Sequence, residues 1–430
     1  MKVGFYTRTS HLGNLSWEDV VDGEVGVSGT DYRNLDLIHQ LSGRAVDVAV
    51  FKRGDGVEIP DSIDVQRVLS LSDAVAKAKD ASVDILWFSN REDEDTKEGV
   101  IRSEQLALPC VVSSGIDLSL EMADLLYETD AVRRLVTVSV PQANLLRDQP
   151  VFEKTEAIHG NGLKPVFLEP VPASLTRDPE RVGYLGALTR SKGFHHVAKA
   201  WPDVRSAVPG ATLEVIGSAK LYNRNQRLGP LGIAEKSFEQ TYIIPYLGST
   251  QEELHKHGVT FHGLLTPREI RNILEKCAVG VVNPICKGSI ETFCLSAVEV
   301  QACGCAVVSA NRVGLRETAR DGETGILLES EDQLSRVLIE RLQSPEHTRQ
   351  LGETGRRWVR ETFVRETVAD QWINLFMGVL NESPASPPCF SWSEADTRSI
   401  AKEFVRLTRK IPPFQNIPSL RELKSVLTSK

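Results

Sequence analysis

The sequence predicts an α/β protein with two parallel-sheet domains, and three observations support this prediction. Short apolar runs alternate with amphipathic, helix-like stretches along most of the chain, which is typical of βαβ units and a parallel sheet. The alternation lapses at 169–181, where EPVPASLTRDPER holds three prolines and favours an interdomain linker. At 430 residues, the chain is long enough for two or three domains.

The first predicted domain contains five short apolar runs of strand length. They are KVGFYT at 2–7, VDVAVF at 46–51, DILWFS at 84–89, PCVVSS at 109–114 and LVTVSV at 135–140. Amphipathic stretches such as 31–42 and 121–128 lie between them and are predicted helices. Because helical crossovers cover both faces of a parallel sheet, we expect a sheet buried on both sides.

The second predicted domain repeats this alternation. Its strand candidates are VGYLG at 182–186, ATLEVIG at 211–217, VTFHG at 259–263, VGVVN at 279–283 and AVVSA at 306–310. The connection 218–258 is long, and such connections are commonly functional or form a small subdomain. Ligands of these folds bind outside the carboxyl ends of the strands, so we expect a ligand cleft between the two domains.

The C-terminal part is predicted to be helical. Residues 345–380 have a helical pattern, and 381–390 (NESPASPPCF) interrupts it. Ser391 and Glu394 are placed for a capping box at the start of a further helix over 393–411. The apolar residues of this helix recur at helical spacing: Ile400, Phe404, Leu407 and Ile411.

The charge balance is mildly acidic but uneven. With 50 Lys and Arg against 58 Asp and Glu, the net charge is 50 − 58 = −8, which argues against general nucleic-acid binding. Residues 401–430 nevertheless carry seven basic and two acidic residues. Two interpretations remain open for this basic end. We prefer a solvated face packed along one domain, and the alternative is peripheral docking to an anionic membrane surface.

Composition indicates the class and compartment. Hydrophobic residues make up 41% and charged residues 25%, which excludes a mainly disordered or collagenous chain. No apolar run approaches the ~20 residues that span a bilayer, and the start resembles a strand rather than a signal peptide, so we expect a soluble cytoplasmic protein. Of the seven cysteines, only Cys303 and Cys305 form a close pair, so no metal site is predicted. The acidic run at 92–95 has no matching partner and is interpreted as solvated charge.

The stretch 279–310 carries the most chemical information. Its pattern predicts a strand, a loop that includes Ser289, a helix from about Thr292 to Cys303, and a second strand. Gly304 fits the left-handed position that follows a helix. A helix N-terminus offers unpaired N–H groups and a partial positive charge, which suit a phosphate. The predicted donors are the amides of Thr292, Phe293 and Cys294.

Glu291 and Glu299 lie eight positions apart in this stretch. If all residues between them were helical, they would be about 12 Å apart along the axis. That separation is too large for an acid and a base acting on one bond, and it fits a ligand with polar groups at both ends and a diphosphate between them. The pattern Glu, seven residues, Glu, within S-x-E-T-F and before A-C-G-C-A-V-V, resembles the donor-site signature of family 4 retaining glycosyltransferases of GT-B fold. By that resemblance, Glu291 lies by the donor sugar and Glu299 binds the ribose hydroxyls.

A second match lies at the start of the donor-side domain. VGYLGALTRSKGFHHVAKAW at 182–201 resembles the family's first strand and helix, usually written G-R-L-x-x-x-K-G. Lys192 falls on the lysine that neutralises the diphosphate. The arginine position is Ala187, a departure from the pattern, and Arg190 is the candidate for the missing charge.

Further matches extend the resemblance over about 2–380. The stretch 23–51 resembles the family's glycine-rich loop and first helix, in which Gly26 and Gly29 would let the backbone approach the donor phosphates. Ser289 is a further donor-side candidate, and the base is expected near Gly263 and Leu264. The remaining matches are the stretch after the signature at 314–328, an N-G turn at 159–165 and a closing helix at 362–380.

The resemblance implies a GT-B type fold, in which two Rossmann-like parallel-sheet domains face a cleft and C-terminal helices follow. The expected layout is an acceptor-side domain at 1–170, a linker at 171–181, a nucleotide-sugar-binding domain at 182–361, a helix at 362–380 that returns to the first domain, and a basic helical tail at 381–430.

The function implied is retaining transfer of a sugar from a nucleotide-diphosphate sugar to a hydroxyl acceptor, which is a saccharide, a lipid-linked glycan or a small molecule. Glu291 and Lys192 are the expected catalytic residues, and no metal or other cofactor is expected because Lys192 and the amides would stabilise the departing diphosphate. Two alternatives remain open. One is a nucleotide-sugar epimerase of GT-B fold. The other is a non-catalytic sugar-nucleotide-binding protein, which Ala187 supports.

Overall fold

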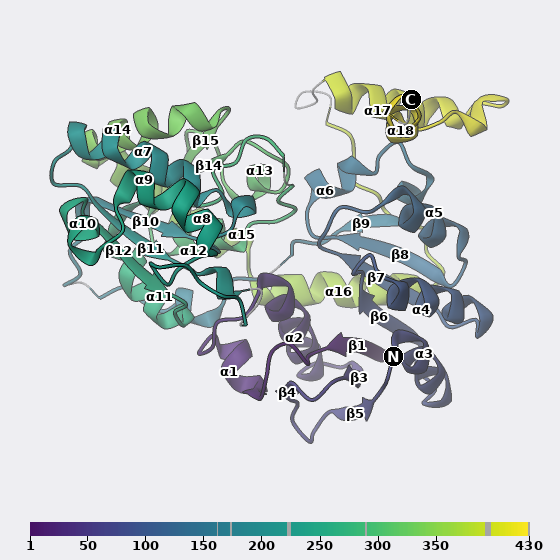
Figure 1. Cartoon of the computed structure of the whole chain (residues 1–430). Helices are drawn as coiled ribbons and strands as arrows, with labels where there is room; N and C mark the ends of the chain where they lie inside the picture. The colour runs from purple at the N-terminus through teal and green to yellow at the C-terminus, as the bar shows by residue number, and fades with distance from the viewer. Residues whose placement is uncertain (161, 173, 222–224, 289, 392–396, 429–430) are drawn as a thin grey trace. The chain divides into compact units, whose positions relative to one another are not determined.

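The chain divides into two units, each built on its own parallel sheet (Figure 1). The computed structural model describes residues 1–430 apart from 161, 173, 222–224, 289, 392–396 and 429–430. The first unit comprises Met1–Trp17, Arg33–Gly160 and Glu366–Lys430. The second comprises Glu18–Tyr32 and Asn161–Arg365.

The boundaries of the units differ from the predicted domain boundaries of 1–170 and 182–361. Arg271, on α11 (Pro267–Leu274), donates hydrogen bonds to the carbonyl oxygens of Val166 at 2.9 Å and Pro170 at 2.8 Å, which holds this segment to the second unit. The predicted linker 171–181 is also too long, because its last four residues begin strand β10 (Asp178–Leu185).

The first unit contains a seven-stranded parallel sheet in the order β5-β3-β1-β6-β7-β8-β9. The strands are β1 (Lys2–Arg8), β3 (Asp47–Arg53), β5 (Asp64–Arg67), β6 (Ile85–Ser89), β7 (Cys110–Ser114), β8 (Val132–Thr137) and β9 (Thr155–Ala157). Four of the predicted strands are confirmed within two residues. The prediction for 135–140 is displaced, because Ser139 leaves the strand and caps α6 (Val140–Leu145). The edge strands β5 and β9 are short and lack an apolar run, so the pattern did not reveal them.

Helices cover both faces of this sheet. On one face, Tyr6, Phe51 and Phe88 join a cluster with the buried side chains of α3 (Leu71–Asp80) and α4 (Glu94–Gln105). On the other face, the alternate residues Phe5 and Trp87 meet α16 (Arg365–Leu380), where the ring centroids of Phe5 and Phe376 lie 6.3 Å apart and those of Trp87 and Trp372 lie 6.1 Å apart. Further helices are α1 (Trp17–Asp22), α2 (Gly29–Ser42) and α5 (Leu120–Glu128). The short strands β2 (Leu15–Ser16) and β4 (Val57–Glu58) form a separate two-stranded sheet.

The second unit contains a six-stranded parallel sheet in the order β12-β11-β10-β13-β14-β15. Besides β10, its strands are β11 (Thr212–Ile216), β12 (Val259–Gly263), β13 (Cys277–Val281), β14 (Ala306–Ala310) and β15 (Gly325–Leu328). All five predicted strands are confirmed. The helices that cover the sheet are α7 (Phe194–Ala207), α11, α12 (Leu295–Ala302), α13 (Leu315–Thr318), α14 (Leu334–Gln343) and α15 (Pro345–Thr362).

The long connection 218–258 folds against α7 around one buried carboxylate. It contains short helices at α8 (Lys236–Phe238), η5 (Glu239–Ile243), α9 (Ile244–Leu247) and α10 (Gln251–Lys256). Glu239 is fully buried, and its oxygens accept hydrogen bonds from the backbone N–H groups of Ile233 at 2.9 Å, Ala234 at 2.8 Å and Leu231 at 2.8 Å. The carboxylate thereby replaces the ladder bonds that an irregular segment lacks.

The C-terminal helical region consists of separate helices rather than one. The predicted stretch 345–380 is interrupted after Thr362, and the closing helix α16 starts at Arg365 instead of 362. The tail contains α17 (Thr397–Arg409) and α18 (Leu420–Thr428). Glu394 of the predicted capping box lies outside the described residues. Among the helices that the structure describes, none combines the length and apolar composition that crossing a bilayer requires.

The Glu239 cluster gives a stability prediction. In Glu239→Gln the amide –NH₂ group would face one of the backbone donors, so we expect the free energy of unfolding to fall by about 1.5–3 kcal/mol, the range for hydrogen bonds to a charged group. Urea denaturation measures this difference. The matched control is Glu252→Gln in the exposed first turn of α10, with an expected change below about 0.5 kcal/mol. Equal losses in the two variants would contradict the role given to Glu239.

Candidate functional site

A cation and a carboxylate meet where two neighbouring strands of the second sheet end. Strands β10 and β13 are paired and parallel, so the loops that follow them lie at the same edge. Lys192 comes from the first loop and Glu291 from the second, and Lys192 Nζ lies 2.5 Å from Glu291 Oε2. Asn283, two residues after the end of β13, donates from Nδ2 to the same oxygen at 2.8 Å. The side chains of Lys192 and Glu291 are 24% and 15% exposed, so a ligand can reach both.

Two glycines fix the backbone around this pair. Gly193, directly after Lys192, has φ +79°, and a Cβ there would lie 2.8 Å from the side chain of Ile285. The Tyr184 hydroxyl donates to the Lys192 carbonyl oxygen at 2.8 Å. Gly314 packs so closely on the Glu291 loop that a Cβ would lie 2.1 Å from the carbonyl oxygen of Thr292. Both loops are therefore held in one conformation by contacts that larger residues would exclude.

Glu299 lies in a different environment from Glu291. It is in the interior of α12, and its Oε1 lies 2.6 Å from Lys164 Nζ, with the two side chains only 7% and 8% exposed. Lys164 Nζ also lies 4.9 Å from the ring centroid of Tyr32. Glu299 is thus a buried, paired carboxylate, and a solvated position on a surface helix is excluded. Nothing in the local sequence around Lys164 marked it as the partner, because the two residues are 135 positions apart.

The helix of the signature segment begins later than predicted. Helix α12 starts at Leu295, and Cys294 is its N-cap residue without a side-chain cap hydrogen bond. The amides of Thr292, Phe293 and Cys294 therefore precede the helix instead of forming its first turn. Only the second half of the segment from Glu291 to Glu299 is helical. The distance between these two glutamates is therefore not the one expected for a continuous helix. The prediction for Gly304 is confirmed, since its φ is +79° just after the helix.

The side chains near the start of α12 are packed. The Phe293 ring lies edge-on to Phe363, with centroids 5.7 Å apart. Thr292 and Cys294 are buried. Burial raises the pKa of the Cys294 thiol to about 12, so it stays protonated at neutral pH and is a poor nucleophile. Ser289 lies outside the described residues.

The predicted glycine-rich loop belongs to the second unit. A Cβ on Gly26 would lie 3.0 Å from the carbonyl oxygen of Leu265, and one on Gly29 would lie 4.0 Å from the side chain of Leu295. Gly29 thus lies beside the first residue of α12. Gly263 has φ +71°, and the Leu264 side chain is exposed after the end of β12. Gly26 is therefore next to the loop that was expected to contact the base.

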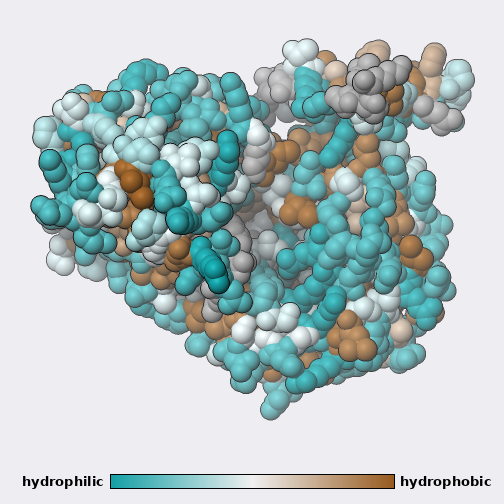
Figure 2. All heavy atoms as spheres, in the orientation of Figure 1, coloured by the Kyte–Doolittle hydropathy of each residue, from teal (hydrophilic) through white to brown (hydrophobic). Residues whose placement is uncertain are grey.

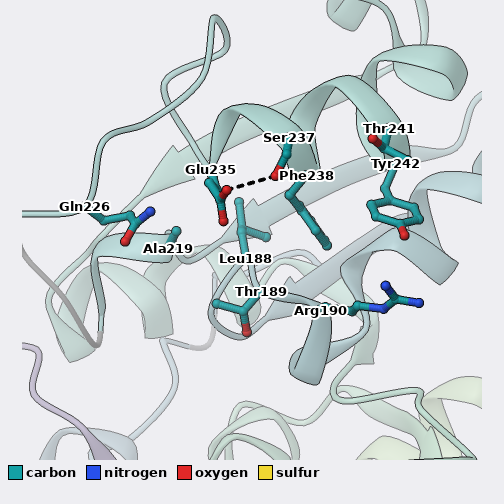
Figure 3. A pocket seen from close by; sticks show the side chains of 10 residues that line it. All are labelled: Leu188, Thr189, Arg190, Ala219, Gln226, Glu235, Ser237, Phe238, Thr241 and Tyr242. Atoms are coloured by element: carbon teal, nitrogen blue, oxygen red, sulfur yellow. Dashed lines mark hydrogen bonds between the residues drawn. The ribbon is translucent and has the colours of Figure 1, made fainter.

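Arg190 lines a cavity, while Lys192 contacts Glu291. Figure 3 shows Arg190 below the ring of Tyr242, and the guanidinium carbon lies 5.6 Å from the ring centroid. Burial, followed by the charges of His196 and Arg190, lowers the pKa of the neighbouring His195 to about 4, so His195 is neutral at pH 7. The cavity has a volume of about 440 Å³ and is lined by Leu188, Thr189, Arg190, Ala219, Gln226, Glu235, Ser237, Phe238, Thr241 and Tyr242.

The acidic run at 92–95 is structural. Asp93 caps α4 by accepting from the Thr96 N–H at 3.0 Å, and Asp95 Oδ2 lies 2.8 Å from Arg8 Nη2. The interpretation of this run as solvated charge is therefore wrong for Asp93 and Asp95, because both have specific partners. Among the described residues, no group of three or more His, Cys, Asp or Glu side chains is placed to hold a metal ion.

These features define a protein of two Rossmann-like units whose second unit has a cation paired with a carboxylate at the carboxyl ends of two strands. The family described as glycosyl transferases group 1 matches residues 171–358, which contain Lys192, Glu291 and Glu299. This part of the chain, about 44% of it, is therefore similar to that family.

Individual glycosyltransferases are also similar to this chain. The chain is 25% identical over 221 residues to the GDP-mannose-dependent alpha-(1-6)-phosphatidylinositol monomannoside mannosyltransferase of Mycolicibacterium smegmatis, covering 49% of this chain and 53% of that protein. The chain thus spans about half the length of this curated relative. Anabaena HepE in complex with UDP matches with a TM-score of 0.63 and 17% identity over 88% of this chain and 100% of that one. Sucrose-phosphate synthase from Thermosynechococcus elongatus matches with a TM-score of 0.64 and 19% identity over 89% and 100%. The structural likenesses show that the chain has the GT-B fold.

The buried pair gives a prediction for the site. Lys164→Met leaves the Glu299 carboxylate buried without its partner, so we expect the free energy of unfolding to fall by about 3–5 kcal/mol. The double variant Lys164→Met, Glu299→Gln removes both charges and should recover most of this loss. Calorimetric unfolding of the three proteins measures the coupling.

The matched control is Arg336→Met, which breaks the ion pair of Arg336 with Glu340, at 3.2 Å on the exposed face of α14. Its expected cost is below about 1 kcal/mol, because water screens exposed pairs. A cost for Lys164→Met no larger than that for Arg336→Met would show that Lys164 and Glu299 are not coupled as described.

Proposed function

We propose that this protein is a retaining glycosyltransferase that moves a sugar from a nucleotide-diphosphate sugar to a hydroxyl acceptor. One observation carries the proposal: Lys192 and Glu291 meet at the carboxyl ends of β10 and β13, within the stretch that matches the family. Nucleotide ligands bind open α/β sheets at this edge. In this proposal the second unit binds the donor, and the first binds the acceptor.

Lys192 and Glu291 have complementary roles. The Lys192 ammonium carries a fixed positive charge and N–H donors, and its ion pair with Glu291 holds it where it can bond oxygens of a diphosphate. As the bond to the sugar breaks, negative charge develops on the leaving diphosphate, and a fixed cation stabilises it. Asn283 and Lys192 both bond Oε2 of Glu291, which holds its carboxylate toward the sugar end of the donor.

Glu299 is proposed to bind the ribose hydroxyls. Lys164 holds its Oε1, which leaves Oε2 to accept a hydroxyl hydrogen bond. Because the pair is buried, the carboxylate keeps its orientation when the site is empty. The Glu299 side chain would therefore lose little conformational entropy when the ribose binds.

The relatives suggest which donors and acceptors to test first. The mycobacterial relative is named for GDP-mannose and a phosphatidylinositol monomannoside, and HepE has been solved with UDP and with UDP-glucose. A hydroxyl on a saccharide or on a lipid-linked glycan is the acceptor class that we propose. The first candidate donors are GDP-mannose and UDP-glucose.

The proposed reaction needs no enzymic nucleophile. The acceptor oxygen attacks the anomeric carbon on the face that the diphosphate leaves, and a phosphate oxygen of the leaving group takes the acceptor's proton. One glycosidic bond forms, one sugar–phosphate bond breaks, and the nucleoside diphosphate leaves with the proton. Lys192 takes the place that a divalent metal has in other sugar transfers.

A thermal-shift screen tests donor binding. A ligand that binds only the folded state raises the melting temperature, so among UDP-, GDP-, ADP- and TDP-sugars we expect one base to stabilise the protein. Release of nucleoside diphosphate then tests turnover. Lys192→Ala and Glu291→Ala should each lower release by at least about a hundredfold, the scale for a group that stabilises transition-state charge.

The outcomes of this test separate the possibilities. Full activity in both variants would refute the site assignment. Stabilisation by a donor without nucleotide release across an acceptor panel would show a binding protein instead of an enzyme. Arg336→Met serves as the control, because Arg336 lies on the exposed face of α14, outside the proposed site.

Chelation tests the proposed absence of a metal. With Lys192 supplying the positive charge, we expect nucleotide release to continue unchanged in the presence of EDTA. Loss of activity on chelation, with recovery on adding Mg²⁺ or Mn²⁺, would contradict this part of the mechanism.

A further inference from the structure

The C-terminal helix α17 turns its apolar face outward. Phe404 is 70% exposed, and Ile400 and Leu407 are also exposed, whereas Lys402 is buried on the opposite side and Glu403 is buried at the flank of the helix. Residues four, seven and eleven positions apart share one face of a helix, so Ile400, Phe404, Leu407 and the adjoining Ile411 form one stripe. This arrangement reverses the usual one, in which the apolar stripe packs on the core.

The polar face of α17 holds the tail to the first unit. Glu403 Oε2 lies 3.1 Å from Arg147 Nη1, and both side chains are almost completely buried. Lys402 Nζ lies 3.6 Å from Asp148 Oδ1. Arg409 donates to the Asp148 carbonyl oxygen at 2.7 Å. Because charges fix the inner face, the outward position of the stripe follows from the packing and does not result from loose attachment.

Further apolar side chains of the tail are exposed after α17. Ile411 and Phe414 are exposed after the helix, and Leu423 and Val426 are exposed on α18. In Figure 2, brown and tan apolar residues appear at the upper right, where the C-terminal segment lies. We call this set the apolar stripe: Ile400, Phe404, Leu407, Ile411, Phe414, Leu423 and Val426.

The charge around the apolar stripe is positive. Residues 397–428 contain seven basic and two acidic residues, a net charge of 7 − 2 = +5. Of the two acidic residues, Glu403 is buried and Glu422 lies 3.5 Å from Arg409. Arg398, Lys410 and Lys424 are exposed. Over the part of the tail that the structure describes, the outer surface therefore combines apolar side chains with exposed cations.

We propose that this surface docks onto an anionic membrane, with the apolar stripe in the interfacial region and the cations at the lipid headgroups. Phenylalanine and leucine on one face, with basic residues beside them, are what helices lying in a bilayer interface present. Anionic headgroups attract such cations. A second copy of the chain would bring two positive surfaces together, which disfavours self-association through this face. The inference rests on the tail surface alone and does not depend on the proposed reaction.

Vesicle sedimentation of the full-length protein tests the proposal. We expect co-sedimentation with phosphatidylcholine vesicles that contain about 30% phosphatidylglycerol, and at least tenfold weaker partitioning onto pure phosphatidylcholine. Raising NaCl from about 0.1 M to about 0.5 M should weaken binding, because salt screens exposed charges.

Two variants test the two parts of the surface. Phe404→Ser with Leu407→Ser removes apolar contact, and Lys410→Glu with Lys424→Glu reverses exposed charge. Each should lower partitioning onto the anionic vesicles at least tenfold while leaving the melting temperature unchanged. The matched control is Leu69→Ser with Ile101→Ser, two exposed apolar residues of the same unit outside the tail, which should bind like the unmodified protein.

Three results would overturn the proposal. They are equal binding to neutral and anionic vesicles, full binding by both tail variants, and a concentration-dependent dimer in light scattering that Phe404→Ser with Leu407→Ser abolishes. The last result would show that the apolar stripe joins two copies of the chain. Both double variants replace exposed side chains, and the charge variant leaves the apolar stripe intact. If one double variant failed to fold, the other would still test the proposal.

Discussion

The ion pair of Lys192 and Glu291 depends on the parallel sheet of the second unit, and the proposed chemistry depends on the ion pair. Strands β10 and β13 are neighbours although almost a hundred residues separate them, and the parallel direction brings their following loops to one edge. Gly193 and Gly314 allow the close approaches that hold those loops. A cation and a carboxylate fixed at this edge are the groups that a sugar diphosphate needs.

The two glutamates of the signature differ in environment, and this difference fits the different roles that we propose for them. Glu291 is partly exposed, so its contact with Lys192 can rearrange when a ligand arrives. Glu299 is buried against Lys164, and rearranging that pair would leave a charge without a partner in the interior. In the proposed function, the fixed carboxylate of Glu299 would orient the nucleotide, and the adjustable carboxylate of Glu291 would then contact the sugar end of the donor.

Much of this architecture could be predicted from the sequence because it depends on local pattern. The strands of the second sheet are apolar runs between turns, and Gly304 marks the end of α12 in the sequence itself. The partner of Glu299, the direction of Arg190 and the start of α12 at Leu295 could not be predicted, because tertiary contacts decide each of them. The tail shows the same limit: periodicity revealed an amphipathic helix, but only the buried contacts of Lys402 and Glu403 show which face is outside.

Calorimetric titration tests the proposed role of Lys192 most directly. The ligands are the nucleoside diphosphate selected by thermal shift and the corresponding nucleoside, and the proteins are the unmodified chain and Lys192→Gln. We expect the variant to bind the diphosphate at least about tenfold more weakly, a loss of about 1.4 kcal/mol, while its affinity for the nucleoside is unchanged. Unchanged diphosphate affinity, or equal weakening for both ligands, would show that Lys192 does not bind the diphosphate.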